Sequence, residues 1–193
     1  MKKIKKFCIS ILSTILITAL LTVNCFAYTG FTRTPLRGQE TDYWCWAASC
    51  QMLLETQNIY LSQTQIASGL NDAATISQIL GRIRACAPNI QWDYHKGGRS
   101  FEQIESTINT GWAICMLGVY RGTNSGHAMV ITGYDRNPAG FNNIWLQDPW
   151  GDDNTAPHDG EEGWCNAAAP GTGNYSNSIF LQCQGLVWDG TIV

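Results

Sequence analysis

The sequence is poor in charge, since only 14% of its 193 residues are Asp, Glu, Lys or Arg, and only three residues are histidine. Its basic residues form no cluster outside the first few positions, which disfavours a surface for nucleic acid or anionic membranes. No segment repeats at a fixed period, and none is of low complexity. These absences leave an ordinary globular protein as the expectation.

Metal-binding patterns are missing as well. There is no C-x-x-C pair and no Cys/His cluster at zinc spacing, so we expect neither a metal nor any other cofactor. One acidic stretch offers carboxylates that calcium could use: Asp152, Asp153, Asp159, Glu161 and Glu162. Their spacing fits no EF-hand, and we expect a solvated loop there.

Large apolar side chains are abundant. Hydrophobic residues make up 45% of the chain, with 8 Trp, 7 Tyr and 6 Phe, which is enough to fill one core. We therefore predict a single domain over residues 28–193.

Residues 1–27 have the pattern of a secretory signal peptide. Four lysines lie within Met1–Phe7, an apolar run follows over Cys8–Val23, and Ala27 offers a small residue at a cleavage point. No other stretch is apolar enough to cross a bilayer. We expect export, with no membrane contact after cleavage. Loss of the four lysines would leave eight basic and fifteen acidic side chains, a net charge of −7, which favours solubility.

Six cysteines remain after residue 27, and export permits disulfides between them. They are Cys45, Cys50, Cys86, Cys115, Cys165 and Cys183. If Cys45 and Cys50 share a helix, their side chains point about 140° apart and cannot bridge. The pairing of the other five stays open at this point.

The periodicities predict helices first and strands afterwards. Helices are expected over 43–56, 62–69, 74–85 and 100–110, with Asp42 capping the first helix and Ser-x-x-Gln capping boxes at Ser62 and Ser100. Strands are expected over 112–120, 128–134, 144–147 and 179–188, with residues 28–40 as an irregular arm and 151–177 as a long loop. This order is typical of an α+β fold.

Cys45 is the candidate nucleophile. It lies in the first turn of the predicted helix over 43–56, where the helix dipole stabilises a thiolate. Gln39 precedes it by six residues and is a candidate donor to an oxyanion, together with the Cys45 N–H. The alternative is that Cys45 is a buried structural cysteine beside two core tryptophans, Trp44 and Trp46. Those tryptophans are expected in the core, or else along the wall of a cleft.

A catalytic base must be one of three histidines. His127 begins a predicted strand and follows Gly126, which leaves space for a substrate. His95 lies in a predicted exposed loop. His158 lies in the long loop and is the second choice for the base. We therefore assign the base to His127.

Asp148 is the candidate residue to orient His127. The midpoint between positions 127 and 148 falls between Asn137 and Pro138, inside a predicted turn, so a regular hairpin would place the two residues opposite each other. Their Cβ atoms would then lie about 5 Å apart, close enough for a carboxylate to hold an imidazole. An Asp before Pro also commonly initiates a turn. Trp150, two residues later, is a candidate shield for this contact.

Taken together, these motifs resemble the papain-like cysteine peptidases. The residues that carry the resemblance are Gln39-x5-Cys45-Trp-Ala-Ala, Gly126-His127-Ala and Asp148-Pro-Trp, and they look most like the bacterial AvrRpt2-type and peptidase-C39-like branch. The resemblance implies a papain-like α+β fold, with helices on the Cys45 side and an antiparallel sheet on the His127 side. It also implies peptide-bond hydrolysis through a thioester.

The expected activity is therefore that of a secreted cysteine peptidase acting on a protein or peptide substrate, as a monomer. Acyl transfer to an amine, or glutamine deamidation, would use the same three residues and is the first alternative. A secreted binding or toxin-accessory module without turnover is the second. The presence of Gln39, Cys45, His127 and Asp148 together argues against the second alternative.

Overall fold

The computed structural model describes residues 28–120, 122–136, 142–151, 156–166 and 186–193. Its helices are α2 (Cys45–Thr56), α3 (Gln63–Ala67), α4 (Ile76–Cys86) and α5 (Phe101–Asn109). Its strands are β1 (Tyr28–Phe31), β2 (Tyr94–Lys96), β3 (Ile114–Tyr120), β4 (Gly126–Arg136), β5 (Asn142–Asp148), β6 (Glu161–Asn166) and β7 (Leu186–Ile192).

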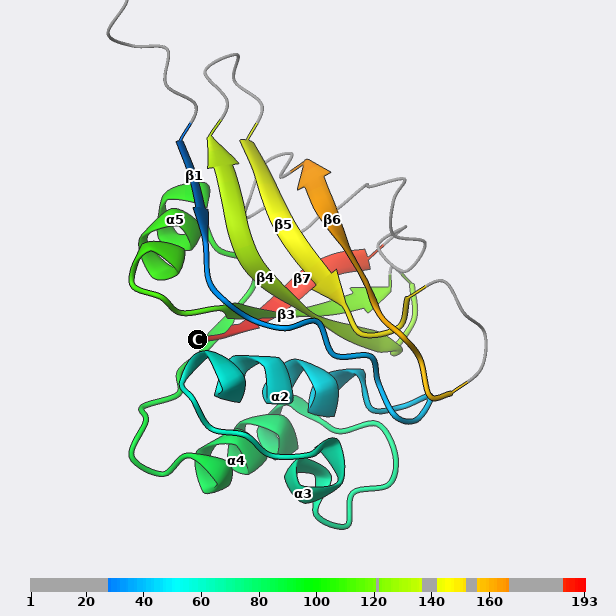
Figure 1. Ribbon diagram of the computed structural model, residues 1–193. Helices are drawn as coiled ribbons and strands as arrows, with labels where there is room; N and C mark the ends of the chain where they lie inside the picture. Colours follow the sequence, from blue (N-terminus) through cyan, green and yellow to red (C-terminus); the bar gives the residue numbers. More distant parts are fainter. Residues whose placement is uncertain (1–27, 121, 137–141, 152–155, 167–185) are drawn as a thin grey trace, which may run out of the picture.

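All seven strands form one antiparallel sheet with the order β2-β7-β3-β4-β5-β6, and β1 pairs with the far end of β4. Helices α2, α3 and α4 lie together beneath the sheet, and α5 packs apart from them near β1 and β4 (Figure 1). The α+β prediction is confirmed, with helices on the side of Cys45 and an antiparallel sheet carrying His127.

The alternation of side chains along the central strands creates two cores. On β3, Cys115 and Leu117 join the core between the sheet and α2. Ile114 and Met116 point to the other face and join the core between the sheet and α5. Because both faces are covered, these strands are apolar at nearly every position rather than at every second one.

Helix α2 is buried on nearly all sides, with nine of its twelve residues buried. It begins at Cys45, two residues later than predicted, and its N-cap is Trp44, which makes no side-chain cap. The predicted capping by Asp42 is therefore wrong. The helix is held by burial among α3, α4 and β4 rather than by a capping side chain.

Both predicted capping boxes are present, at Ser62 with Gln65 and at Ser100 with Gln103. The structure adds a third, in which the Thr75 hydroxyl accepts from the Gln78 N–H and the Gln78 side chain accepts from the Thr75 N–H. Helix α4 consequently begins at Ile76 rather than at residue 74.

Three predictions for the strands were wrong. The arm over 28–40 begins with strand β1, His95 lies in strand β2 rather than in a loop, and β6 lies within the stretch 151–177 that was predicted as a loop. These strands are short and lie toward the ends of the sheet, so their pairing with β4, β7 and β5 forms them where local sequence does not. Strand β7 runs to Ile192, and residues 179–185 of its predicted span lie outside the described residues.

The register of the β4–β5 hairpin also differs from the prediction. Val130 pairs with Gln147, and beyond a bulge at Thr132 the pairing shifts so that Gly133 faces Trp145. Continued by one step, the ladder would place Asp148 opposite Met129 rather than opposite His127. The slip near the site is two residues, and an even slip keeps Asp148 on the same face as His127, as a diagonal neighbour.

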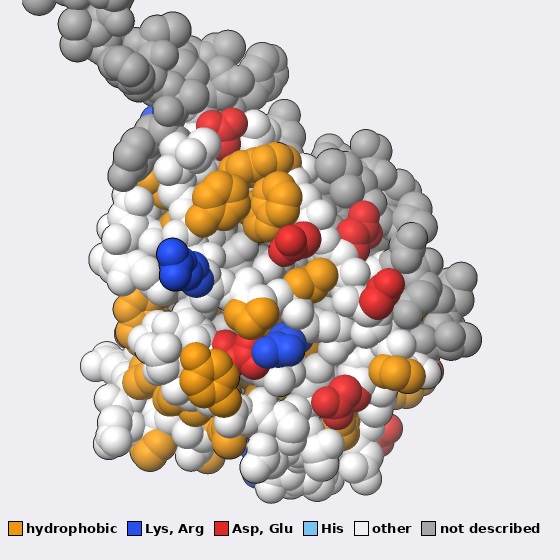
Figure 2. Space-filling model, viewed as in Figure 1, with side chains coloured by type: hydrophobic (Ala, Val, Ile, Leu, Met, Phe, Trp, Pro, Cys, Tyr) orange, Lys and Arg blue, Asp and Glu red, His pale blue; other side chains and the backbone are white. Residues whose placement is uncertain are grey.

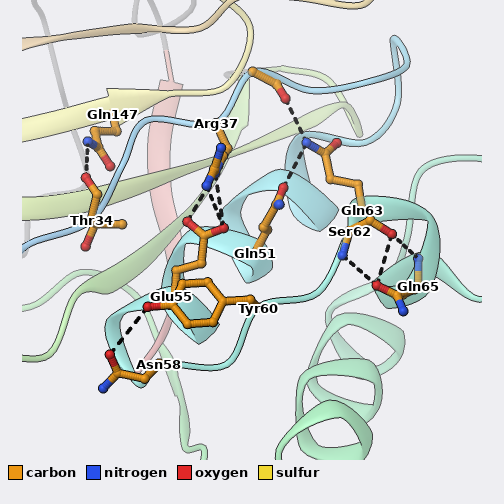
Figure 3. Close-up of polar contacts among 11 residues, drawn as sticks. Thr34, Arg37, Gln51, Glu55, Asn58, Tyr60, Ser62, Gln63, Gln65 and Gln147 are labelled. Carbon is orange, nitrogen blue, oxygen red and sulfur yellow. Dashed lines mark hydrogen bonds and ion pairs between the residues drawn. The ribbon is translucent and has the colours of Figure 1, made fainter.

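The segment between β1 and α2 is fastened to both layers by polar contacts (Figure 3). Arg37 Nε donates to both carboxylate oxygens of Glu55 at 3.1 Å, and Gln63 Nε2 donates to the Gly38 carbonyl at 2.7 Å. On the sheet side, Gln147 Nε2 donates to the Thr34 carbonyl at 3.0 Å. These contacts fix the backbone that leads into Cys45.

Part of the sheet that α2 does not cover carries a cluster of three aromatic side chains, Phe31, Trp145 and Trp164, on β1, β5 and β6. Their rings meet edge to face with centroids 5.1–5.8 Å apart. Figure 2 shows large hydrophobic side chains gathered on this part of the surface.

Among the described residues, no helix is both long and apolar enough to cross a membrane.

The Arg37–Glu55 contact yields a test of stability. Glu55 is almost fully buried, so removing its cation leaves a carboxylate without its ion-pair partner. We expect Arg37→Leu to lower the free energy of unfolding by about 1–2 kcal/mol, because Arg37 itself is partly exposed. Urea denaturation measures the free energy of unfolding of each variant. Arg33→Leu, which removes an exposed cation from the same segment, should change stability by less than about 0.5 kcal/mol; equal effects of the two variants would contradict the assignment.

Candidate active site

Cys45 is the first residue of α2 and is half-buried at the edge of a cleft between the helices and the sheet. Its backbone N–H belongs to the first turn, where amides have no acceptor within the helix. The thiol therefore lies where the positive end of the helix dipole and a free N–H both favour negative charge.

His127 faces Cys45 from the start of β4 and is hydrogen-bonded to Asp148. His127 Nε2 lies 2.6 Å from Asp148 Oδ1, and both side chains are buried. Cys45 lines the same cleft, and its thiol is one of the groups that raise the pKa of this imidazole. Since Asp148 engages Nε2, the other ring nitrogen, Nδ1, is left for the thiol. The structure thus brings together three of the four residues that the sequence singled out.

Burial and charge act on His127 in opposite directions. Burial disfavours the imidazolium, but the Asp148 carboxylate, its hydrogen bond and the Cys45 thiol outweigh burial and raise the pKa of His127 to about 10. Because this pKa exceeds the ordinary value of about 6.5, the proton on His127 stabilises the folded protein. That contribution is fully present below pH 6.5 or so and is lost as the pH rises through about 10.

Asp148 has two tasks, which the sequence presented as alternatives. Its Oδ1 is hydrogen-bonded to His127 and also accepts a hydrogen bond from the backbone N–H of Trp150 at 2.9 Å. The second hydrogen bond closes an Asx-turn, in which an Asp side chain accepts from the backbone N–H two residues later. Turn formation therefore holds the carboxylate in place for the imidazole.

Gln39 is placed less directly than predicted. Its side chain is fully buried, Nε2 donates to the Thr41 carbonyl at 2.8 Å, and Gln39 does not line the cleft. Its backbone is held on both sides, because its N–H donates to the Pro149 carbonyl and its carbonyl accepts the His158 N–H, each at 2.9 Å. The role of Gln39 in binding an oxyanion stays a prediction.

His158 belongs to a neighbouring polar group rather than to the cleft. Its Nε2 lies 3.3 Å from Asp42 Oδ1, and its ring stacks on Trp150 with centroids 4.2 Å apart. Gly38 permits this approach, since a Cβ there would lie 1.8 Å from the His158 carbonyl oxygen. Neither His158 nor His95, which lines a separate shallow hollow, lies in the cleft with Cys45.

The cleft encloses about 700 Å³, which suits a peptide segment. Besides Cys45 and His127 it is lined by Trp46 and Trp150, by α4 and by the start of β4. Trp46 therefore takes both roles that the sequence left open, since it is buried in the core and also lines the cleft. Trp44 is a core residue only, and its Nε1 donates to the Leu70 carbonyl.

The other thiols in the helical core are poor nucleophiles. Burial raises the pKa of Cys50 and of Cys115 well above the ordinary range, and burial also raises that of Cys86. These three and Cys45 are free thiols, and Cys183 lies outside the described residues. Among the described residues, no group of three His, Cys, Asp or Glu side chains could hold a metal ion.

A helix-start cysteine that contacts a buried His–Asp pair across a cleft is the arrangement of a papain-like thiol hydrolase. The model of the Peptidase_C39 like family matches residues 31–168. The chain belongs to this family and is a cysteine-type peptidase. The AvrRpt2-type part of the resemblance stays a prediction.

No curated protein matches the chain. Among solved structures, the chain is similar to a double glycine motif protease from an AMS/PCAT transporter, crystallised in complex with the leader peptide. The two are 13% identical, the match covers 85% of this chain and 92% of that chain, and the TM-score is 0.48.

The raised pKa of His127 can be tested in a Cys45→Ser background, which removes the titration of the thiol. We expect the imidazole NMR signals of His127 to stay in the protonated position through pH 8, because Asp148 holds the proton. Adding Asp148→Asn should lower the pKa by several units, toward about 6.5 or below. Adding Asp93→Asn instead, which removes a carboxylate outside the cleft, should leave the pKa unchanged. Identical midpoints with and without Asp148 would refute the assignment.

Proposed function

We propose that this protein is a secreted peptidase that hydrolyses peptide bonds with Cys45 as nucleophile, His127 as base and acid, and Asp148 as the residue that orients His127. The observation that carries the proposal is the buried 2.6 Å contact between His127 and Asp148, with Cys45 lining the same cleft as His127. Each group alone has a structural explanation, but the three together form a complete acyl-transfer site.

In the first half-reaction, the Cys45 sulfur, as thiolate beside protonated His127, attacks the carbonyl carbon of the substrate. A C–S bond forms, and the carbonyl oxygen becomes an oxyanion held by the Cys45 N–H. We propose the Gln39 amide as a second donor, which requires its side chain to turn from the Thr41 carbonyl toward the cleft when substrate binds; in that position it would add on the order of 3 kcal/mol to transition-state stabilisation. The C–N bond then breaks, and His127 gives its proton to the leaving amine.

In the second half-reaction, neutral His127 takes a proton from water as the water oxygen attacks the thioester. The C–S bond breaks, the acid product leaves, and the thiolate–imidazolium pair is restored. Asp148 keeps the ring oriented throughout and is not itself protonated. The chain needs no cofactor for any of these steps.

The substrate is a protein or peptide, because the cleft is open to solvent on the Ser125–Gly126 side and large enough for an extended segment. We expect the protein to act as a monomer and to bind no nucleic acid. Acyl transfer to an amine or deamidation of glutamine would use the same residues, and the nature of the acceptor at the thioester distinguishes these reactions from hydrolysis.

Thiol labelling tests the assignment of the nucleophile. We expect iodoacetamide at mildly acidic pH to modify Cys45 first, because its thiol is paired with His127 whereas the buried thiols are held protonated. His127→Ala should slow the labelling of Cys45 by on the order of ten-fold or more. Peptide mass spectrometry locates the label. Slow modification spread over several cysteines, and insensitive to His127, would leave a binding domain without turnover.

Hydrolysis of a peptide pool tests the activity itself. Cys45→Ala should reduce cleavage by a factor on the order of 10³ or more. Cys86→Ala, which removes a half-buried thiol outside the cleft, should leave cleavage near the level of the wild-type protein. Adding a primary amine separates the alternatives: an amide product instead of the free acid would show acyl transfer.

Export is proposed from residues 1–27, whose charge and apolar run are those of a signal peptide. Expression of the full chain in a bacterial host should therefore place a protein with Tyr28 at its N-terminus outside the cytoplasmic membrane. N-terminal sequencing of the exported and retained fractions identifies the first residue of each. An intact Met1 terminus in both fractions would overturn the proposal.

A further inference from the structure

The cleft has an uneven charge. Two carboxylates line it, those of Asp42 and Asp189, whereas no lysine or arginine does so among the described residues. The thiol and imidazole of the proposed catalytic pair together add no net charge. A substrate side chain that enters this cleft therefore meets a negative field with no opposing cation.

The two carboxylates are not equivalent. Asp42 lies at the exposed rim, with 60% of its side chain accessible, and is engaged by His158 at 3.3 Å. Asp189 is half-buried, and no hydrogen bond or ion pair joins its carboxylate to another of the described residues. Of the two carboxylates, Asp189 is therefore the one without an ion-pair partner among the described residues.

A β-bulge places Asp189 in the cleft. On the β3–β7 ladder, Leu117 pairs with Gly190 but Gly118 pairs with Trp188, so Asp189 is the extra residue without a partner. Bulges of this kind redirect a side chain and are frequent beside active sites. The bulge is held by two hydrogen bonds, from Trp188 Nε1 to the Gly190 carbonyl at 2.8 Å and from the Gly97 N–H to the Asp189 carbonyl at 2.6 Å.

The cleft that Asp189 lines also has apolar walls. Ile76 and Ile79 of α4 line the cleft on the helical side, and Leu117 and Val119 line it on the sheet side. When a peptide fills the cleft and displaces water, the Asp189 charge loses hydration, and its attraction to a cation strengthens as the local dielectric constant falls. Aliphatic walls next to a carboxylate match a side chain with an aliphatic stem and a cationic end.

We propose that Asp189 determines specificity, and that the cleft selects peptides with an Arg or Lys side chain whose cation pairs with Asp189 while its stem packs against Ile76, Ile79, Leu117 and Val119. This inference rests on the proposed function, since it assigns the substrate class of the same cleft. An acidic side chain in that position is repelled, and a neutral one desolvates Asp189 without providing a partner.

Peptide binding to the Cys45→Ala protein tests the selectivity without requiring chemistry. The probes are pairs of peptides that differ only in arginine or its neutral isostere citrulline, with the residue moved through successive positions. Calorimetry should show at least about ten-fold tighter binding of the arginine peptide at one position, which is typical of a charge-assisted hydrogen bond. That preference should fall with rising salt concentration.

Three further variants, each in the Cys45→Ala background, assign the effect. Asp189→Asn should abolish the preference, whereas Asp93→Asn, which removes the same charge outside the cleft, should retain it. The inference is overturned if no arginine peptide binds more tightly than its citrulline twin, or if Asp189→Asn keeps the preference. Loss of the preference in Asp42→Asn alone would also overturn it.

Hydrolysis by the protein with Cys45 intact separates this inference from the proposed function. Cleavage of peptides without any preference for a basic residue would refute the role of Asp189 and leave the peptidase assignment in place. Selective binding of arginine peptides without any cleavage would support the role of Asp189 and refute the proposed hydrolysis.

Discussion

Burial of α2 against the central strands is the constraint on which the rest of the structure depends. The helix is apolar on nearly every side, so it must be covered by α3 and α4 on one side and by β3 and β4 on the other. That packing brings the first residue of α2 to the edge where β4 begins. Cys45 and His127, 82 positions apart in the sequence, thereby meet at the rim of a cleft because their elements pack against each other.

Desolvation gives the His127–Asp148 contact its importance. In water, an exposed ion pair contributes little, but here both groups are buried, and an unpaired imidazolium would be costly. The carboxylate reverses the effect of burial and keeps His127 protonated through neutral pH. The Asp148 oxygen that holds the imidazole also holds the Trp150 N–H, so the turn after β5 and the site share one anchor.

Two bulges, in the two strands that flank β3, shape the site. The bulge at Thr132 in β4 sets the register of β5, and through it the position of Asp148 relative to His127. The bulge at Asp189 in β7 turns a carboxylate into the cleft that a regular strand would have paired. In both places one extra residue, rather than a change of fold, decides where an acidic side chain lies: Asp148 beside His127, and Asp189 in the cleft.

The sequence by itself determined the helical half and the capping boxes at Ser62 and Ser100, and it singled out Cys45, His127 and Asp148, which the structure places near one another. These rest on local chemistry: periodicity, caps, and residue types that suit nucleophile, base and orienter. The tertiary structure alone decided the pairing of β1, β2 and β6, the even slip of the β4–β5 hairpin, and the burial of Gln39 away from the cleft. Strand pairing and bulges depend on partners far along the chain: Gly190 is a residue that often marks a bulge, but only the ladder with β3 decides that Asp189 is the extra residue. Contacts between distant segments therefore decided what chemistry surrounds the three residues that the sequence had named.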